Sequence, residues 1–388
     1  MPIVNRFADF QADTVAWRHD IHSHPEILYE VHRTAATVAE KLRAFGLDEV
    51  TTEIGRTGVV GVIKGRKSGS GKVVGLRADM DALPLTEITG KLYASAVPGK
   101  MHACGHDGHT AMLLGAARYL AETRNFDGTA VVIFQPAEEG GGGGKAMIED
   151  GLMDRWNIQE VYGMHNMPGL DVGKFATRPG PLMASTDEFT LDITGRGGHA
   201  ARPQGTIDPI IVGTALVEAL QTIVSRSVDP IESVVVSVTK FHAGEAHNII
   251  PQTARIAGTV RTLKPEMRDL AEKRIREIAA GVGATYGAIV AVDYDRNYPV
   301  TRNHPAETAF AVGVAREVAG PSQVDAEAPP VMGGEDFSYM LEARPGAFIF
   351  IGNGDTAGLH NPAYDFNDDV IPIGCSYWAR LVESAMPA

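Results

Sequence analysis

Hydrophobic positions in the first third of the chain alternate between two periods. Residues 31–45 carry apolar side chains three and four positions apart, which predicts an amphipathic helix, and 109–123 predicts another. Short runs rich in β-branched residues at 58–63, 72–76 and 130–134 predict strands between and after these helices. Helices that alternate with apolar strands indicate an α/β sheet.

The end of the chain repeats this pattern. Helices are expected near 305–318 and 373–385, and an apolar strand is expected at 347–351. We therefore predict that both ends of the chain build one domain, from residues 1–184 and 298–388.

The middle of the chain, residues 185–297, has a different order of elements. The predicted strands are 188–194, 233–241, 253–262 and 288–294, and the predicted helices are 208–226 and 266–286. Strand, helix, strand, strand, helix and strand follow one another, which is the ferredoxin-like order βαββαβ. We predict an α/β protein of two domains, in which this segment is inserted into the first.

Charge and composition narrow the function classes. The 388 residues include 35 Lys and Arg against 48 Asp and Glu, a formal net charge of −13. Such a chain has no electrostatic attraction to nucleic acid or anionic lipid, and no run of about 18 apolar residues predicts a membrane span. Two cysteines, Cys104 and Cys375, are too few for a disulfide framework, and no signal peptide is visible. A cytoplasmic protein is the simplest expectation.

Metal-binding side chains crowd the loop before the helix predicted at 109–123. Cys104, His106, Asp107 and His109 fall within six residues. A thiolate two residues from an imidazole suits a borderline-soft divalent cation. A polar loop that only caps the helix is the alternative interpretation.

A second cluster follows the strand 130–134, where Glu138 and Glu139 are neighbours. Sites in α/β sheets gather at the carboxyl ends of strands, and consecutive residues point to different sides. One carboxylate can therefore bind a metal while the other faces a bound water as general base. An exposed acidic turn is the alternative.

Two histidines complete this set, because His165 and His360 are each expected at the end of an apolar strand. Either one alone is more often a hydrogen-bonded core or loop residue. Together, Cys104, His106, Glu139, His165 and His360 exceed the three ligands that one catalytic zinc uses. We therefore expect two divalent ions, which can lower the pKa of a shared water toward ~7 and so favour hydrolysis.

Two aspartates follow the strand 72–76, and we expect both Asp79 and Asp81 behind the metal ligands. Metal-bound imidazoles commonly donate their second nitrogen to a carboxylate, so one of these acids could orient a ligand histidine. A phosphatase-like site with Asp79 as covalent nucleophile is an alternative. It leaves the loop with Cys104 and His106 unexplained.

Eight motifs between about residues 16 and 385 resemble those of one known family. They are RADMDALPL, MHACGHDGHTAMLLGAA, FQPAEEG, GMHN, GRGGHAARP, AHNIIPQTARIAGTVRT, MGGEDFSYM and LHNPAYDFND. The chain resembles the aminoacylase and hippurate hydrolase branch of the di-metal amidohydrolases, which also holds indole-acetyl-amino-acid hydrolases and N-acetyl-diaminopimelate deacetylases. This resemblance implies a catalytic domain made from both chain ends and an inserted lid domain that mediates dimerisation, giving a homodimer or a tetramer.

The same resemblance implies roles for single residues. The implied ligands of two manganese, zinc, cobalt or nickel ions are Cys104, His106, Glu139, His165 and His360. Glu138 would be the general base, and His199 would hold the carbonyl oxygen of the scissile amide in a neighbouring subunit's site. Asn248 and Arg261 would bind substrate, since an arginine can hold a carboxylate through two parallel hydrogen bonds.

We expect hydrolysis of the amide bond of an N-acyl amino acid, such as hippurate or an N-acetyl amino acid, to a carboxylic acid and a free amino acid. The alternatives are a di-metal exopeptidase acting on dipeptides and a non-catalytic metal-dependent binding protein. Nucleotide binding is not expected. The segment 195–200 fits the dinucleotide pattern, but Pro203 blocks the helix that should open directly after it, and the glycine run 140–144 lacks the flanking residues of a phosphate loop. His22 and His24 of HSHPE also match a family motif, and we expect a structural role for both.

Overall fold

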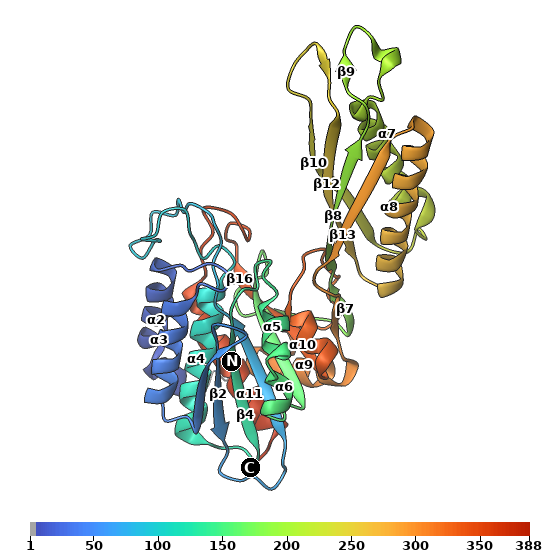
Figure 1. The fold of residues 1–388 in the computed structure, drawn as a ribbon. Coiled ribbons are helices and arrows are strands. Elements are labelled where there is room, and N and C mark those ends of the chain that lie inside the picture. The colour runs from blue at the N-terminus through green and yellow to red at the C-terminus, as the bar shows by residue number, and fades with distance from the viewer. Residues whose placement is uncertain (1–4) are drawn as a thin grey trace. The chain divides into compact units, whose positions relative to one another are not determined.

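Strands from both ends of the sequence build one mixed sheet in the larger of two units. The computed structural model describes residues 5–388. The larger unit comprises the chain as far as Leu182 together with Arg302–Pro329 and Asp336–Ala388, and the smaller comprises Met183–Thr301 and Pro330–Glu335. Early and late parts of the chain therefore lie side by side in the larger unit, as the blue and red segments show (Figure 1).

The sheet of the larger unit has eight strands. They are β1 (Glu49–Ile54), β2 (Gly58–Lys64), β3 (Val73–Asp79), β4 (Thr129–Gln135), β5 (Glu160–Pro168), β6 (Phe175–Ala176), β15 (Val324–Asp325) and β16 (Gly346–Gly354). Their order is β1-β2-β4-β3-β5-β16-β6-β15, and β4, β3, β5 and β16 run parallel. β3 is buried along its whole length, which suits a strand covered on both faces.

Helices cover this sheet. They are α1 (Arg6–Asp9), α2 (Gln11–Ser23), α3 (His32–Ala44), α4 (His106–Thr123), α5 (Gly143–Glu149), α6 (Leu152–Arg155), α9 (Pro305–Ala319), α10 (Phe337–Ala343) and α11 (Ile371–Ala385). The central helix α4 is buried almost throughout, because it packs against β3, α2 and α11. Two further strands, β7 (Gly180–Met183) and β14 (Thr301–Asn303), lie where the chain passes between the units.

The smaller unit has its own sheet and core. Its elements are β8 (Ser185–Thr194), β9 (Gly198–His199), α7 (Pro209–Thr222) with a π-helical turn (Ile223–Ser227), β10 (Val234–Ala243), β11 (Ile249–Ile250), β12 (Thr253–Thr262), α8 (Pro265–Tyr286) and β13 (Ile289–Arg296). The antiparallel sheet has the order β10-β12-β8-β13. Alternate residues of β8 are buried, because α7 and α8 pack against one face of the sheet. The main elements follow one another in the order βαββαβ.

Among the described residues, one helix is long and apolar enough to suit a membrane span. It is Pro209–Ser227, which comprises α7 and its π-helical turn. Val212, Leu216 and Leu220 of α7 nevertheless belong to the buried core of the smaller unit. The helix is therefore amphipathic within this unit, and apolar side chains such as Ile211 remain exposed on its other face.

The structure confirms the expected α/β fold and corrects several local expectations. The helix expected at 109–123 begins at His106, because Gly105 adopts a left-handed φ of 96° that turns the chain into the helix. His165 lies inside β5 rather than after it, since β16 pairs with β5 as far as Pro168. The sequence pattern missed α2, whose buried residues include the polar side chains of Arg18 and His22.

Candidate metal centre

The candidate site lies at the carboxyl ends of β3, β4, β5 and β16. Because these strands are parallel, their carboxyl ends share one edge of the sheet, where α/β proteins commonly place their sites. The residues concerned are Asp79 and Asp81 at the end of β3, Glu138 and Glu139 after β4, His165 in β5, Cys104, His106 and His109 around the start of α4, and His360 after β16.

Side chains that are far apart in the sequence meet here. Three groups that share members have ligand atoms within 4.8 Å of one another. The first is Cys104, His106 and His165; the second is Cys104, Glu139 and His360; the third is His106, Glu138 and Glu139. The Cys104 Sγ lies 3.4 Å from the His165 Nε2, and the Glu139 Oε1 lies 3.2 Å from the His360 Nε2. A sulfur, three imidazoles and two carboxylates thus converge, and this donor set suits borderline-soft divalent ions.

The orientation of two imidazole rings fits metal binding. The His106 Nδ1 donates to the backbone carbonyl of Asp81 at 2.7 Å, and the His165 Nδ1 donates to that of Asn166 at 2.7 Å. Both rings therefore direct their Nε2 into the cluster, which is the arrangement that metal-binding histidines commonly have. Within residues 5–388, the buried His106 Nε2 has no hydrogen-bond partner.

The charge around these side chains also fits a cation. Burial lowers the pKa of His106, but the charges of Asp79 and Asp81 outweigh burial and raise this pKa to about 10. Burial and then the charges of Glu139 and Glu138 raise the pKa of the Cys104 thiol well above its usual range. The cluster carries surplus negative charge, and divalent cations would balance it and stabilise the thiolate.

Asp81 orders the turn that carries the two glutamates. Its carboxylate accepts hydrogen bonds from the backbone N–H groups of Glu138 at 2.9 Å and Glu139 at 3.1 Å. The residue before them, Ala137, has a left-handed φ of 53°, which an alanine adopts only where its surroundings enforce it. The backbone carbonyl of Asp81 accepts from the His106 Nδ1 at 2.7 Å, and the Asp81 Oδ1 lies 3.5 Å from the same nitrogen.

Asp79 supports a histidine outside the predicted ligand set. Its Oδ1 is hydrogen-bonded to the His109 Nδ1 at 2.6 Å, whereas its Oδ2 lies 3.7 Å from the His106 Nε2. The Arg77 Nη1 donates to the Asp79 Oδ2 at 2.6 Å. Sequence reasoning missed Arg77, although a charged residue in the otherwise apolar run KVVGL-R-A was a usable signal for a buried ion pair.

Asp107 belongs to a separate buried network, although its position in the sequence grouped it with the predicted metal ligands. Its Oδ2 is hydrogen-bonded to the His22 Nδ1 at 2.9 Å and lies 3.6 Å from the Arg18 Nε. The His22 Nε2 lies 3.3 Å from the carboxylate of Glu87. The motif HSHPE thus contributes a buried, fully engaged His22, whereas His24 is half exposed and bonds to the backbone of its own helix.

The other predicted site residues lie in the smaller unit. His199 in β9 faces Ile249 in the two-stranded ribbon with β11, and the backbone N–H of Ala200 donates to the Asn248 carbonyl at 3.0 Å. His199 and Asn248 are therefore close neighbours. The Ala201 N–H donates to the His199 Nδ1 at 3.1 Å, which leaves the Nε2 of this exposed ring as a hydrogen-bond donor.

Arg261 lies elsewhere in the smaller unit, on β12, and is half buried. It donates to the Val260 carbonyl at 3.0 Å and to the Thr259 hydroxyl. Burial lowers the pKa of its guanidinium, while the charges of Glu188 and Asp187 act in the opposite direction. The structure does not group Arg261 with the His199 ribbon.

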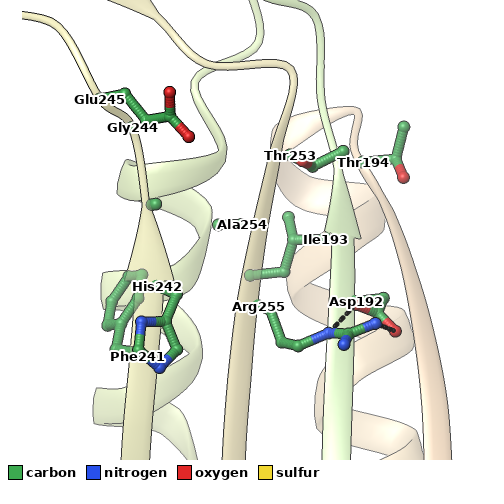
Figure 2. Close-up of a pocket in the computed structure, with 11 residues that line it drawn as sticks. Asp192, Ile193, Thr194, Phe241, His242, Gly244, Glu245, Thr253, Ala254 and Arg255 are labelled. Carbon is green, nitrogen blue, oxygen red and sulfur yellow. Dashed lines mark hydrogen bonds and ion pairs between the residues drawn. The ribbon is translucent and has the colours of Figure 1, made fainter.

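A hollow of about 740 Å³ lies on the smaller unit, at the ends of β8, β10 and β12. Its charged groups include Asp192 and Arg255, which form a two-point ion pair with N···O distances of 2.6 and 3.0 Å (Figure 2). His242 and Glu245 also line this hollow. The residues expected to carry the chemistry are not among those that line it.

Parallel strands with cysteine, histidine and adjacent glutamate side chains at their carboxyl ends are the architecture of a metal-dependent α/β hydrolase. Residues 75–384 match the pattern of peptidase family M20/M25/M40. The chain is 45% identical to hippurate hydrolase of Campylobacter jejuni over 381 residues, 98% of each chain. It is 37% identical to N-acetylcysteine deacetylase of Bacillus subtilis over 373 residues, 96% of each chain.

Solved structures agree with this result. A dinuclear metal-binding peptidase of the M20 family from Bacillus subtilis superposes with a TM-score of 0.84 and 34% identity, covering 98% of this chain and 99% of that one. A structure described as a putative aminohydrolase of methicillin-resistant Staphylococcus aureus gives a TM-score of 0.91 at 35% identity, covering 99% of both chains. The protein belongs to peptidase family M20/M25/M40.

Proposed function

We propose that this protein is a metal-dependent amidohydrolase that cleaves the amide bond of N-acyl amino acids, releasing a carboxylic acid and a free amino acid. The observation that carries the proposal is the buried Glu138 beside a group of sulfur, imidazole and carboxylate donors. The names of two full-length relatives, hippurate hydrolase and N-acetylcysteine deacetylase, support this substrate class.

The residues proposed to hold two divalent ions are Cys104, His106, Glu139, His165 and His360. Manganese, zinc, cobalt and nickel all suit this mixture of ligands. When bound, paired ions of this kind polarise the amide carbonyl and lower the pKa of a water. The free Nε2 of His106 and the surplus negative charge of the cluster support the assignment.

The chain's own residues would then move protons and hold the substrate. Glu138 takes a proton from the attacking water and later gives it to the departing amine. In the site of a neighbouring subunit, His199 donates from Nε2 to the oxygen of the amide carbonyl as negative charge develops there. Asn248 and Arg261 bind the substrate, with the guanidinium of Arg261 directed to the free carboxylate of the amino acid.

The exposed surface of the smaller unit supports a role for it as lid and dimerisation domain. Ile210 and Ile211 of α7 and Phe241 of β10 are exposed apolar side chains, and β10 is an edge strand of its sheet. A second copy of the chain would cover this surface and pair the strand edge, which would otherwise invite aggregation. We propose a homodimer, or a tetramer built from it, in the cytoplasm, where the free thiols of Cys104 and Cys375 would stay reduced.

The function is tested on the purified protein by metal analysis, followed by activity assays. The substrates are hippurate, a set of N-acetyl amino acids and unblocked dipeptides, each with and without a chelator. We expect about two divalent ions per chain, hydrolysis of the acylated amino acids, loss of activity with the chelator and recovery when metal is returned. Preferential cleavage of dipeptides would favour the exopeptidase alternative, and metal binding without turnover would favour a binding protein.

A further inference from the structure

A buried hydrogen-bond cluster next to Glu138 is centred on Asp336, which lies just before α10. The Asp336 carboxylate accepts from the Arg77 Nη2 at 2.9 Å and from the backbone N–H of Gly144 at 2.8 Å. The Gln135 Nε2 lies 2.7 and 2.8 Å from its two oxygens. Donors on β3, at the end of β4 and in α5 thus fix one orientation of this side chain.

The backbone of the same residue contacts the proposed general base. The Asp336 N–H donates to the Glu138 Oε1 at 3.3 Å. Asp336 is therefore hydrogen-bonded to Arg77 through its side chain and to Glu138 through its backbone. Arg77 itself is buried and bonds through its other terminal nitrogen to Asp79, at the end of β3.

The glycine run 140–144 makes this cluster possible. A Cβ on Gly143 would lie 1.7 Å from the Pro136 carbonyl oxygen, so only glycine lets the chain pass under the turn that carries Glu138. A Cβ on Gly144 would lie 3.0 Å from the Asp336 carbonyl oxygen. It would push the Gly144 N–H away from the Asp336 carboxylate, which accepts its hydrogen bond. Gly143 and Gly144 are therefore a close-packed support of the turn.

We propose that Asp336 is a positioning residue for the general base, and that Arg77, Gln135 and the Gly144 N–H hold it in place. The fixed carboxylate keeps the Asp336 N–H directed at Glu138, so that the base keeps one orientation through both proton transfers. This inference rests on the proposed role of Glu138. A purely structural ion-pair cluster would stabilise the fold without affecting the base.

The first test is Asp336→Asn, which keeps the size and the backbone N–H but places an amide NH₂ among three donors. We expect kcat on hippurate to fall by about 10²-fold, because a small misplacement of a reacting group has an effect of this size. KM and metal content should stay the same. An unchanged kcat, or a loss of bound metal that accounts for the loss of activity, would overturn the proposal.

Arg77→Lys and Arg77→Met serve as a second, independent pair. Lysine keeps the charge but offers fewer directed donors, so it should retain more of kcat than methionine does. If Asp336→Asn does not fold, this pair decides the question on folded protein. Equal kcat values in the two variants and the wild type would contradict the proposed role.

The matched control is Asn303→Asp, an equally conservative change at another buried amide of the larger unit. Asn303 accepts from the Phe348 N–H at 2.6 Å and donates to the Thr177 hydroxyl at 3.0 Å, so this change should lower stability and leave kcat unchanged.

Glu138→Gln separates the positioning role of Asp336 from the proposed role of Glu138 as general base. Full turnover in Glu138→Gln would show that the proposed base is wrong. Loss of turnover in Glu138→Gln together with full turnover in Asp336→Asn would overturn the positioning role alone.

Discussion

The two sets of proposed functional residues are held in very different ways. In the larger unit, His106 and His165 are buried and their rings are fixed by hydrogen bonds to backbone carbonyls. In the smaller unit, His199 is exposed on a short two-stranded ribbon, with one hydrogen bond to its ring from Ala201. His106 and His165 are thus ordered by the fold around them, whereas His199 presents its ring to solvent.

This difference has an energetic basis. Burying charged and polar groups is unfavourable unless they are paired, so the larger unit surrounds its cluster with supporting bonds from Asp81, Arg77 and Asp336. An exposed histidine needs no such support. We therefore expect variants in the buried set to affect chemistry, metal binding and stability, and variants in the exposed set to affect chemistry or substrate binding alone.

The largest effect is expected for Glu138→Gln. Removal of the general base should lower kcat on hippurate by about 10³-fold, because proton transfer at two steps depends on this carboxylate. Metal content, measured by atomic emission, should be unchanged. Glu139→Gln is the matched neighbour and should instead lose metal. Wild-type turnover in Glu138→Gln would reject the assignment.

The next largest effect is expected for His199→Ala. Loss of a hydrogen-bond donor to the developing oxyanion should lower kcat by about 10²–10³-fold. The melting temperature and metal content should not change, because the ring is exposed. His242→Ala, at another exposed histidine of the smaller unit, is the control. A loss of less than about tenfold would indicate an ordinary turn histidine.

A stability effect with a defined pH dependence is expected for His22→Gln. Burial lowers the pKa of His22, but its hydrogen bond with Asp107, the charge of Asp107 and its hydrogen bond with Glu87 raise the pKa to about 9. Because this value exceeds the usual 6.5, the protonated ring stabilises the fold fully below pH 6.5, and this contribution is lost as the pH rises through 9.

Denaturant unfolding of the wild type and His22→Gln at pH 6 and pH 10 measures this contribution. The difference in the free energy of unfolding should be about 2–3 kcal/mol larger at pH 6 than at pH 10. His24→Gln, two residues away and half exposed, is the control and should show a much smaller difference. A difference for His22→Gln that does not vary with pH would show that His22 stabilises the fold by packing alone.

The smallest effect is expected for Arg261→Lys. If the guanidinium binds the substrate carboxylate at two points, lysine should raise KM by about tenfold and change kcat little. Arg255→Lys is the control, because Arg255 already pairs with Asp192 on the exposed sheet surface. Equal KM values for Arg261→Lys and the wild type would remove Arg261 from the substrate site.

Local patterns in the sequence were enough to predict the α/β class and most of the main elements. Apolar runs such as 58–63 and 130–134 became β2 and β4, because a strand covered on both faces needs apolar residues at every position. The residue types at Cys104, Glu139 and His360 also predict a common metal site. Candidate metal ligands can be recognised from sequence in this way because few side chains supply suitable donor atoms.

Only the tertiary structure showed which polar groups support that site. No local pattern indicates that Asp81 bonds to the turn of Glu138, that Asp107 pairs with His22, or that Asp336 lies between Arg77 and Glu138. These partners are separated by between 57 and 259 residues along the chain. Hydrogen bonds of this kind depend on where the folded sheet and its loops place each group, and hydrophobic periodicity carries no information about that placement.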